Sequence, residues 1–234
     1  MSRSEKIVVA IDGFSSCGKS TLARELAKEL HYVFIDSGAM YRGITLYALQ
    51  NNCIAGNELD RGKLIQELDN IQLSFRLNSE TKKPELHLNG ENVEKEIRTP
   101  KVASQVSQVA TIKEVRAKLV DQQREMGKNG GVVMDGRDIG SVVFPNAELK
   151  LFITADIETR VQRRFLELKE KGLDVSRDEV KANLLERDRI DSTRKESPLT
   201  QTEDAVVIDN TEMSRLEQLE LALELVEKKI VTLA

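Results

Sequence analysis

The chain has 234 residues, 40% of them hydrophobic and 32% charged, which is ordinary for a folded globular protein and argues against disorder. A net charge of −4 and the absence of Trp argue against a protein that coats nucleic acid, and the apolar run near the N-terminus is too short for a signal sequence or a membrane span. The two cysteines have no framework spacing, so we expect no disulfide and a reducing, cytoplasmic environment. Together with the charge and the short apolar run, this predicts a cytoplasmic protein with neither nucleic acid nor membrane as partner.

Residues 13–20 read Gly-Phe-Ser-Ser-Cys-Gly-Lys-Ser and match the pattern G-x-x-x-x-G-K-[ST] in full. The β-branched run 6–11 before them predicts a buried strand, and leucines spaced four residues apart after them predict a helix. In this context the backbone N–H groups of the loop and the helix dipole favour phosphate binding, and the alternative of a glycine turn without a ligand is disfavoured. The residues expected to bind a nucleoside triphosphate are Gly13, Phe14, Ser15, Ser16, Cys17, Gly18, Lys19, Ser20 and Thr21.

Two of these side chains have specific expected roles. Lys19 is predicted to reach the β- and γ-phosphates, and the Ser20 hydroxyl is predicted to be a ligand of Mg²⁺.

Further along the chain, residues 33–36 predict a second short buried strand, and residues 37–52 predict a helix. Its apolar stripe is expected to comprise Met40, Ile44, Tyr47 and Ala48. Because ligands bind at the carboxyl ends of strands in open α/β sheets, the polar break at residues 36–38 is a candidate binding position.

The pattern changes after a predicted short helix at 59–68. Alternating apolar residues at 71–77 and at 86 and 88, with Asn89-Gly90 as a hairpin signal, predict a small antiparallel unit at about 70–95. Thr99 followed by Pro100 then predicts the start of a helix that the Thr side chain caps, and a further helix is expected from about 112 to 126.

The remaining chain returns to alternating strands and helices. Strands are predicted at 132–135, 149–153 and 205–209, and helices at 156–171, from a capping box at Ser176 to the region of Pro198, and from a cap at Ser214 to the end. The core face of the last helix is expected to comprise Leu216, Leu219, Leu223, Val226 and Ile230. The predicted fold class is therefore α/β, with a five-stranded parallel sheet and helices on both of its faces.

Charged side chains recur at helical spacing in two predicted helices near the C-terminal third. Arg160, Arg163 and Arg164 fall on one, and Arg187, Asp191 and Arg194 fall on one stripe of the next. Two such helices joined by a short loop can close over a triphosphate. The alternative is a pair of solvated faces with surface ion pairs, in which Glu167, Glu186 and Asp188 serve as ordinary partners. A phosphate loop elsewhere in the chain favours the functional interpretation, because phosphoryl transfer needs positioned cations.

The loop after the third predicted strand reads Asp135-Gly136-Arg137-Asp138. Two carboxylates and a guanidinium at the end of a buried strand exceed what a structural turn requires. Asp135 is placed to hold Mg²⁺-bound water, and Arg137 is suited to bind a phosphate bidentately.

Four segments, in this order and spacing, resemble bacterial cytidylate kinases: residues 13–21, residues 36–42, residues 135–140, and residues 186–188 with Asp191 and Arg194. The resemblance covers nearly the whole chain. It implies that the phosphate and sugar of the acceptor are bound by Ser37, Arg42, Arg137, Arg187 and Asp191. It also implies that the cytosine ring is read by Ser107, Arg116 and Asp138, and that a mobile lid carries Arg160, Arg164 and Arg194, of which Arg160 contacts ATP. A carboxylate, a hydroxyl and a guanidinium complement the donor and acceptors of cytosine.

The resemblance further implies a P-loop kinase that transfers the γ-phosphoryl group of Mg-ATP to CMP or dCMP. The catalytic residues would be Lys19, Arg137, Arg164 and Arg194, and the Mg²⁺ ligands Ser20 and Asp135. The implied domains are a core of residues 1–36, 130–155 and 199–234, a monophosphate-binding domain of 37–129 and a helical lid of 156–198, with a monomer as the default. A kinase of UMP or AMP, and a nucleotide-dependent switch or binding protein, stay open as alternatives.

Overall fold

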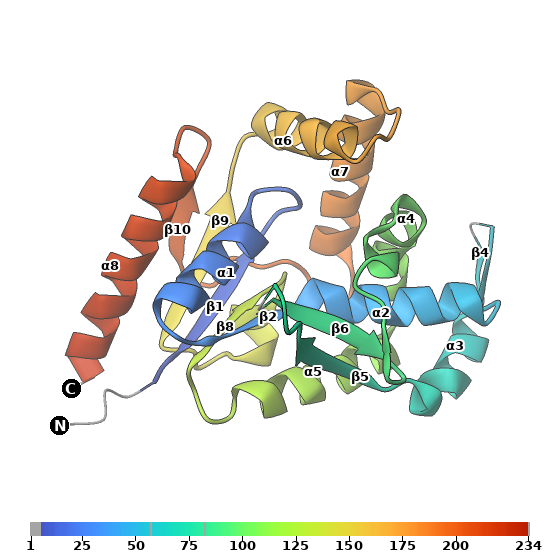
Figure 1. The fold of residues 1–234 in the computed structure, drawn as a ribbon, viewed down its shortest axis with the longest axis horizontal. Coiled ribbons are helices and arrows are strands. Elements are labelled where there is room, and N and C mark those ends of the chain that lie inside the picture. Colours follow the sequence, from blue (N-terminus) through green and yellow to red (C-terminus); the bar gives the residue numbers. More distant parts are fainter. Residues whose placement is uncertain (1–5, 57, 82, 234) are drawn as a thin grey trace. The chain divides into compact units, whose positions relative to one another are not determined.

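The computed structural model describes residues 6–56, 58–81 and 83–233, which form two compact units (Figure 1). Unit 1 comprises the chain up to residue 35 together with the chain from residue 124, and unit 2 comprises residues 36–123. Within the described residues, no helix is long and apolar enough to cross a membrane.

A five-stranded parallel sheet forms the centre of unit 1, as predicted, in the order β10-β9-β1-β8-β2. The strands are β1 (Val8–Gly13), β2 (Val33–Asp36), β8 (Val132–Asp135), β9 (Leu149–Thr154) and β10 (Val206–Asp209). The middle strand, β1, pairs in register with both neighbours, so that Ile11 lies opposite Asp135 on one side and Leu151 on the other. The loops after β1 and β8 therefore leave the same edge of the sheet.

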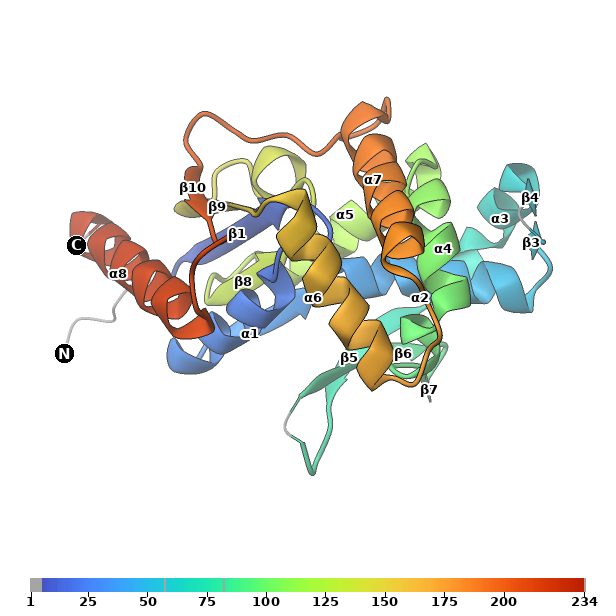
Figure 2. The same cartoon turned by 90° about the horizontal axis from the view of Figure 1, so that it is seen from above.

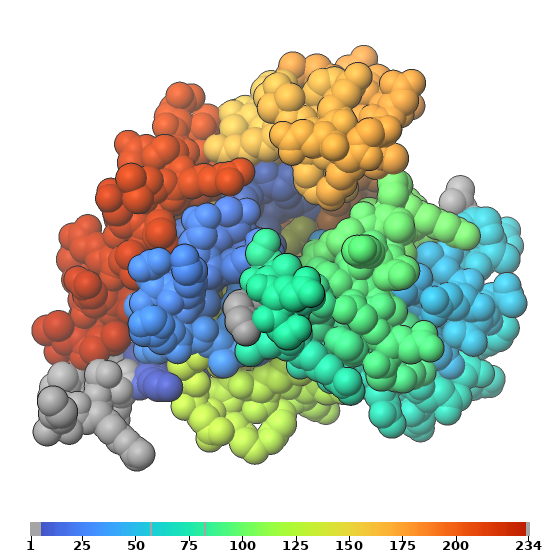
Figure 3. Space-filling model, in the orientation of Figure 1, coloured from blue at the N-terminus to red at the C-terminus, as the bar shows by residue number. Residues whose placement is uncertain are grey.

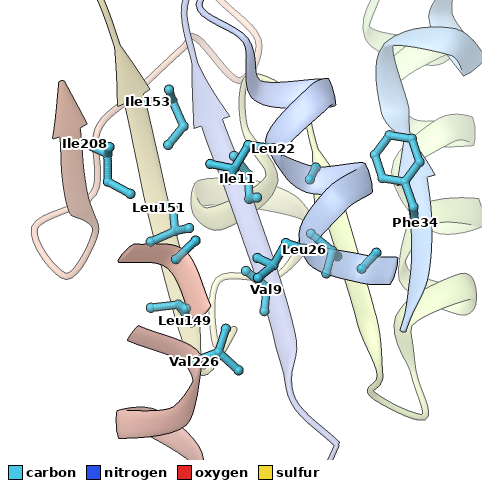
Figure 4. Close-up of a cluster of buried hydrophobic side chains, with 14 of the residues drawn as sticks. Val9, Ile11, Leu22, Leu26, Phe34, Leu149, Leu151, Ile153, Ile208 and Val226 are labelled. Atoms are coloured by element: carbon cyan, nitrogen blue, oxygen red, sulfur yellow. The ribbon is translucent and has the colours of Figure 1, made fainter. Parts of the chain in front are cut away.

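Helices α1 (Lys19–Glu29) and α8 (Arg215–Leu233) pack on one face of this sheet. Figure 4 shows the buried side chains between these helices and the sheet, which are contributed by the strands and by both helices. They include Val9, Ile11, Leu22, Leu26, Phe34, Leu149, Leu151, Ile153, Ile208 and Val226. Successive strand residues point to opposite faces, so Asp12 faces away from this core and toward the π-helical turn η3 (Ile139–Val143) on the other face.

Two antiparallel helices, α6 (Ile157–Glu170) and α7 (Arg177–Thr193), form a hairpin with its own small apolar cluster, and Figures 1 and 2 both show them packed together. Asp156 caps α6 by accepting the Thr159 N–H, and Ser176 with Glu179 forms the predicted capping box at the start of α7. In the space-filling view, the atoms of this hairpin form an orange lobe that projects from the remainder of unit 1 (Figure 3).

Unit 2 combines helices with two small antiparallel sheets, and the predicted insertion at about 70–95 is confirmed. Its strands are β3 (Ile54–Ala55), β4 (Glu58–Leu59), β5 (Leu73–Leu77), β6 (Pro84–Leu88) and β7 (Glu91–Asn92). Its helices are α2 (Ser37–Gln50), α3 (Arg61–Glu67), η1 (Leu68–Asn70), η2 (Glu96–Arg98), α4 (Pro100–Val109) and most of α5 (Lys113–Gly127). The turn between β6 and β7 has positive φ at Asn89 and Gly90, as a tight hairpin requires.

Two local predictions are wrong. Thr99 precedes α4, but its hydroxyl donates to the Glu96 carbonyl and makes no capping bond, so only Pro100 acts as expected at the helix start. Leu216 is 63% exposed and does not join the core, whereas Val226 is fully buried in it and Leu219, Leu223 and Ile230 pack against it in part. Amphipathic spacing alone does not indicate where along a helix the packing begins.

Candidate active site

The phosphate loop joins β1 to α1 and has the backbone conformation that its glycines permit. Gly13 has a φ of 145°, and a Cβ at this position would lie 2.0 Å from the Ile153 carbonyl oxygen of the neighbouring strand β9. Gly18 is left-handed with a φ of 90° and forms the N-cap of α1. The two glycines therefore allow the chain to turn sharply and start the helix with its free N–H groups directed at the loop.

Lys19 is only 5% exposed, although it carries a charge. Its ammonium donates to the Phe14 carbonyl and lies 3.5 Å from the Cys17 sulfur atom. The Lys19 side chain therefore folds back over the phosphate loop that precedes it. Burial, followed by the nearby Arg137 guanidinium, lowers the pKa of Lys19. An anionic ligand in the loop would relieve both effects. Cys17 and Cys53 are both free thiols, and both are buried.

Ser20 and Asp135 meet at the same edge of the sheet. The Ser20 hydroxyl donates to a carboxylate oxygen of Asp135 at 2.6 Å, and Asp135 is buried. These hard oxygen atoms suit Mg²⁺, which typically takes one or two protein ligands and completes its shell with water and substrate phosphates. Among the described residues there is no cluster of three or more His, Cys, Asp or Glu side chains that could hold a metal without such help.

Arg137 is held by partners from two other segments of unit 1. Its Nε donates to Asp191 of α7 at 2.9 Å, and its Nη2 donates to the Ser15 hydroxyl of the phosphate loop at 2.9 Å. Burial opposes the charge, but the Asp191 carboxylate, aided by Cys17 and Asp188, raises the pKa of Arg137. The guanidinium therefore stays charged and fixed beside the loop.

Asp12 anchors the segment that follows Arg137. Its two carboxylate oxygens accept the N–H groups of Ile139 and Gly140 at 2.8 and 2.7 Å. The side chain is 5% exposed, and burial raises the pKa of Asp12 to about 6, aided by the Asp138 charge and opposed by the two N–H groups. Asp12 was not predicted as a site residue, since an Asp at the end of a strand has no distinctive motif.

The α6–α7 hairpin is not a solvated arginine face. Arg160 is 7% exposed, pairs with Asp188, donates to the Ser15 carbonyl at 3.3 Å and stacks over the Phe14 ring at 5.2 Å. Asp188, at 9% exposed, also accepts the Ser15 N–H at 3.1 Å. The alternative of a solvated face with surface ion pairs therefore does not hold for Arg160 and Asp188, which are buried against the phosphate loop.

The other predicted arginines of the hairpin differ in their surroundings. Arg194 is buried at the end of α7, where its Nη atoms lie 3.7 Å from carboxylate oxygens of both Asp138 and Asp191. Arg164 pairs with Glu167 one turn along α6 at 2.7 Å, and Arg187 is partly buried. The structure thus brings Asp138, from the loop after β8, next to Asp191 and Arg194 at the end of α7.

A cavity of about 450 Å³ opens beside the phosphate loop within unit 1. Its lining includes Ser16, Thr21, Arg163, Arg164 and Asn210. Asn210 is fully buried, donates to the Cys17 carbonyl at 2.7 Å and accepts from Arg163 at 2.8 Å. Asn210 was not predicted, because its only signal in the sequence is its place directly after the last strand. The cavity is large enough for a planar ring system next to a phosphate site.

In unit 2, a carboxylate flanked by arginines lies at the start of α2. Asp36 caps this helix through the Ala39 N–H at 2.8 Å, binds Arg98 at 2.9 Å and lies 3.7 Å from Arg42. Burial would raise the pKa of Asp36, but Arg42 and Arg98 outweigh it and lower that pKa. Ser37, the predicted site residue next along the chain, is buried. Arg98 was not predicted.

Ser107 and Arg116 are also buried in unit 2, on α4 and α5. The Arg116 guanidinium donates to the Ala110 carbonyl at 3.2 Å and lies over the Tyr41 ring at 5.3 Å. A buried guanidinium stacked on an aromatic ring is held in one orientation, as a residue that recognises a ligand must be.

Comparison with known proteins agrees with this geometry. The family model described as Cytidylate kinase matches residues 9–228. Proteins named cytidylate kinase are 56% identical in Flavobacterium johnsoniae, over 95% of this chain and 96% of that protein, and 55% identical in Parabacteroides distasonis, over 97% and 99%. The crystal structure of an uncharacterized protein from Eubacterium ventriosum has a TM-score of 0.50 at 10% identity, covers 95% of this chain and 99% of that chain, and shares the fold alone. The chain belongs to the cytidylate kinase family.

Proposed function

We propose that this protein transfers the γ-phosphoryl group of Mg-ATP to CMP or dCMP, forming ADP and CDP or dCDP. The observation that carries the proposal is the phosphate loop, in which the buried Lys19 and the Arg137 bound to Ser15 place two cations at one loop. Membership of the family supports the choice of acceptor.

The donor triphosphate is proposed to bind along residues 13–21, with its base in the adjoining cavity beside Arg164. Lys19 neutralises charge on the β- and γ-phosphates, and Arg160 lies over the loop. When bound, Mg²⁺ supplies charge neutralisation and alignment of the phosphates. Ser20 and Asp135 fit its preference for oxygen ligands and are proposed to hold it directly or through water.

A second set of residues is proposed to bind the acceptor monophosphate. Those that contact phosphate and sugar are Ser37, Arg42, Arg137, Arg187 and Asp191, and those that read the cytosine ring are Ser107, Arg116 and Asp138. The acceptor oxygen is already ionised near neutral pH, so the reaction requires no general base. Its rate depends on alignment and on the stabilisation of charge by Lys19, Arg137, Arg164 and Arg194.

We further propose that residues 156–198 act as a lid and residues 37–129 as the monophosphate-binding domain. Water competes with the acceptor for the phosphoryl group, so a lid that completes the site only around both substrates suppresses hydrolysis. Arg160 of the hairpin donates to the Ser15 carbonyl and lies over the Phe14 ring of the phosphate loop, and these contacts supply a means by which the lid senses the donor.

An acceptor panel tests the function. ADP formation is measured with Mg-ATP and with CMP, dCMP, UMP, AMP or GMP in turn, against a control without acceptor. We expect CMP and dCMP to dominate and the control to be silent. A preference for UMP or AMP would refute the base assignment but retain phosphoryl transfer. Equal hydrolysis of ATP in the control, or no turnover at all, would contradict the kinase function.

A further inference from the structure

Asp188 makes a contact that the function proposed above does not use. Its carboxylate accepts the backbone N–H of Ser15 in the phosphate loop at 3.1 Å and the guanidinium of Arg160 from α6. Backbone N–H groups of such loops are donors for phosphate oxygens. Here one of them is bound instead by a side chain of α7, which fastens this helix directly to the loop.

Asp191, three residues further along the same helix face, provides a second attachment. It accepts from Arg137 at 2.9 Å, and Arg137 in turn donates to the Ser15 hydroxyl at 2.9 Å. The contacts therefore close a ring that runs from Ser15 to Asp188, along α7 to Asp191, through Arg137 and back to Ser15. A displacement of any one member moves the others.

Burial makes this ring rigid. The ring members Ser15, Asp188 and Asp191 are buried, as is Arg160, the ion-pair partner of Asp188, and a buried charge that loses its partner is strongly destabilised. A solvent-exposed pair on the same helix provides a contrast, since Glu186 and Arg189 pair at 2.7 Å with both side chains more than half exposed.

We propose that Asp188 is a positioning residue for phosphoryl transfer, which by docking α7 on the phosphate loop lets Asp191 and Ser15 orient Arg137 toward the transferred group. This inference rests on the proposed kinase function. It assigns Asp188 no contact with substrate, and its effect on the reaction passes through Arg137.

The test is a double-mutant cycle between Asp188→Asn and Arg137→Lys, with kcat and both KM values measured for Mg-ATP and CMP. In Asp188→Asn, an NH2 group replaces one carboxylate oxygen. It faces one of the two hydrogen-bond donors and cannot accept a hydrogen bond from it. We expect kcat to fall about 10- to 100-fold with each KM changed less than about threefold, since misplacement of a positioned group affects the transition state most. In the Arg137→Lys background, the same substitution should lower kcat less than about threefold, because the effects of substitutions at coupled residues are not additive.

The matched control is Glu186→Gln on the solvent side of α7, which should leave kcat unchanged. Thermal unfolding and calorimetric binding of AMP-PNP verify that each variant is folded and binds the donor. Where Asp188→Asn does not fold, Ser15→Ala removes the hydroxyl that Arg137 contacts, and its loss of kcat should likewise disappear in the Arg137→Lys background.

The inference is overturned by an unchanged kcat, by a loss of equal size in both backgrounds, or by a loss explained by a smaller folded fraction. A rise in KM alone would assign Asp188 to binding and would also overturn it. Turnover of CMP by the wild-type protein decides the proposed function separately. Where the wild type uses another monophosphate, the cycle is run with that acceptor.

Discussion

The carboxyl group of Asp12 links the stability of this protein to pH in a direction opposite to that of most acidic residues. Burial raises its pKa from an ordinary 3.8 to about 6 in the folded state. Between these values the folded protein binds a proton that the unfolded chain does not, so this group stabilises the fold fully below pH 3.8 and loses its effect as the pH rises through 6. At about 1.4 kcal/mol per unit of pKa, the loss is about 3 kcal/mol.

Asp12→Asn isolates this contribution. The Asn amide faces one of the two N–H groups that Asp12 accepts, at Ile139 or Gly140, but that cost does not vary with pH. The free energy of unfolding of both proteins is measured with urea between pH 4.5 and 7.5. The wild-type value minus the variant value should fall by about 2 kcal/mol over this range. A difference that is independent of pH, or that increases with pH, would refute the reasoning.

Three substitutions test other parts of the account. Lys19→Ala should lower the rate of phosphoryl transfer on the order of 10²- to 10³-fold, because it removes a charge that stabilises the transition state. The control is Lys28→Ala, which removes an exposed lysine from the same helix. Near-normal turnover in a folded Lys19→Ala variant would contradict the role of this lysine. Asp138→Ala should reduce the preference for CMP over UMP more than it changes the KM for ATP, and an unchanged preference would exclude this residue from base recognition. Gly43→Ala should lower the unfolding midpoint, because its Cβ would lie 2.8 and 2.9 Å from methyl groups of Leu86 and Leu73, at a cost of about 1–3 kcal/mol. An unchanged midpoint would show that these leucines move aside freely.

Features encoded within a short segment could be predicted from the sequence. The phosphate loop is local, since its glycines, Lys19 and the flanking strand and helix lie within about thirty residues, and the insertion is marked by its hairpin signal. The capping boxes at Ser176 and Ser214 are local for the same reason.

Contacts between distant segments could not be predicted in this way. Asp188 meets Ser15 across 173 positions, and Asp12 meets Ile139 across 127. Helical spacing predicted that Arg160 shares a helix face with the other arginines. It does not reveal that the Phe14 ring and the Asp188 carboxylate, from two other segments, cover this side chain. Which polar side chains are buried depends on the packing of the α6–α7 hairpin on the loop, and that packing has no local signature.

The central claim is the transfer of a phosphoryl group to CMP, and the most direct measurement is identification of the products. The protein is incubated with Mg-ATP and CMP, and the nucleotides are separated and quantified over time. We predict that CDP and ADP appear in equal amounts and that inorganic phosphate does not accumulate. ADP with an equal amount of inorganic phosphate and no CDP would contradict it.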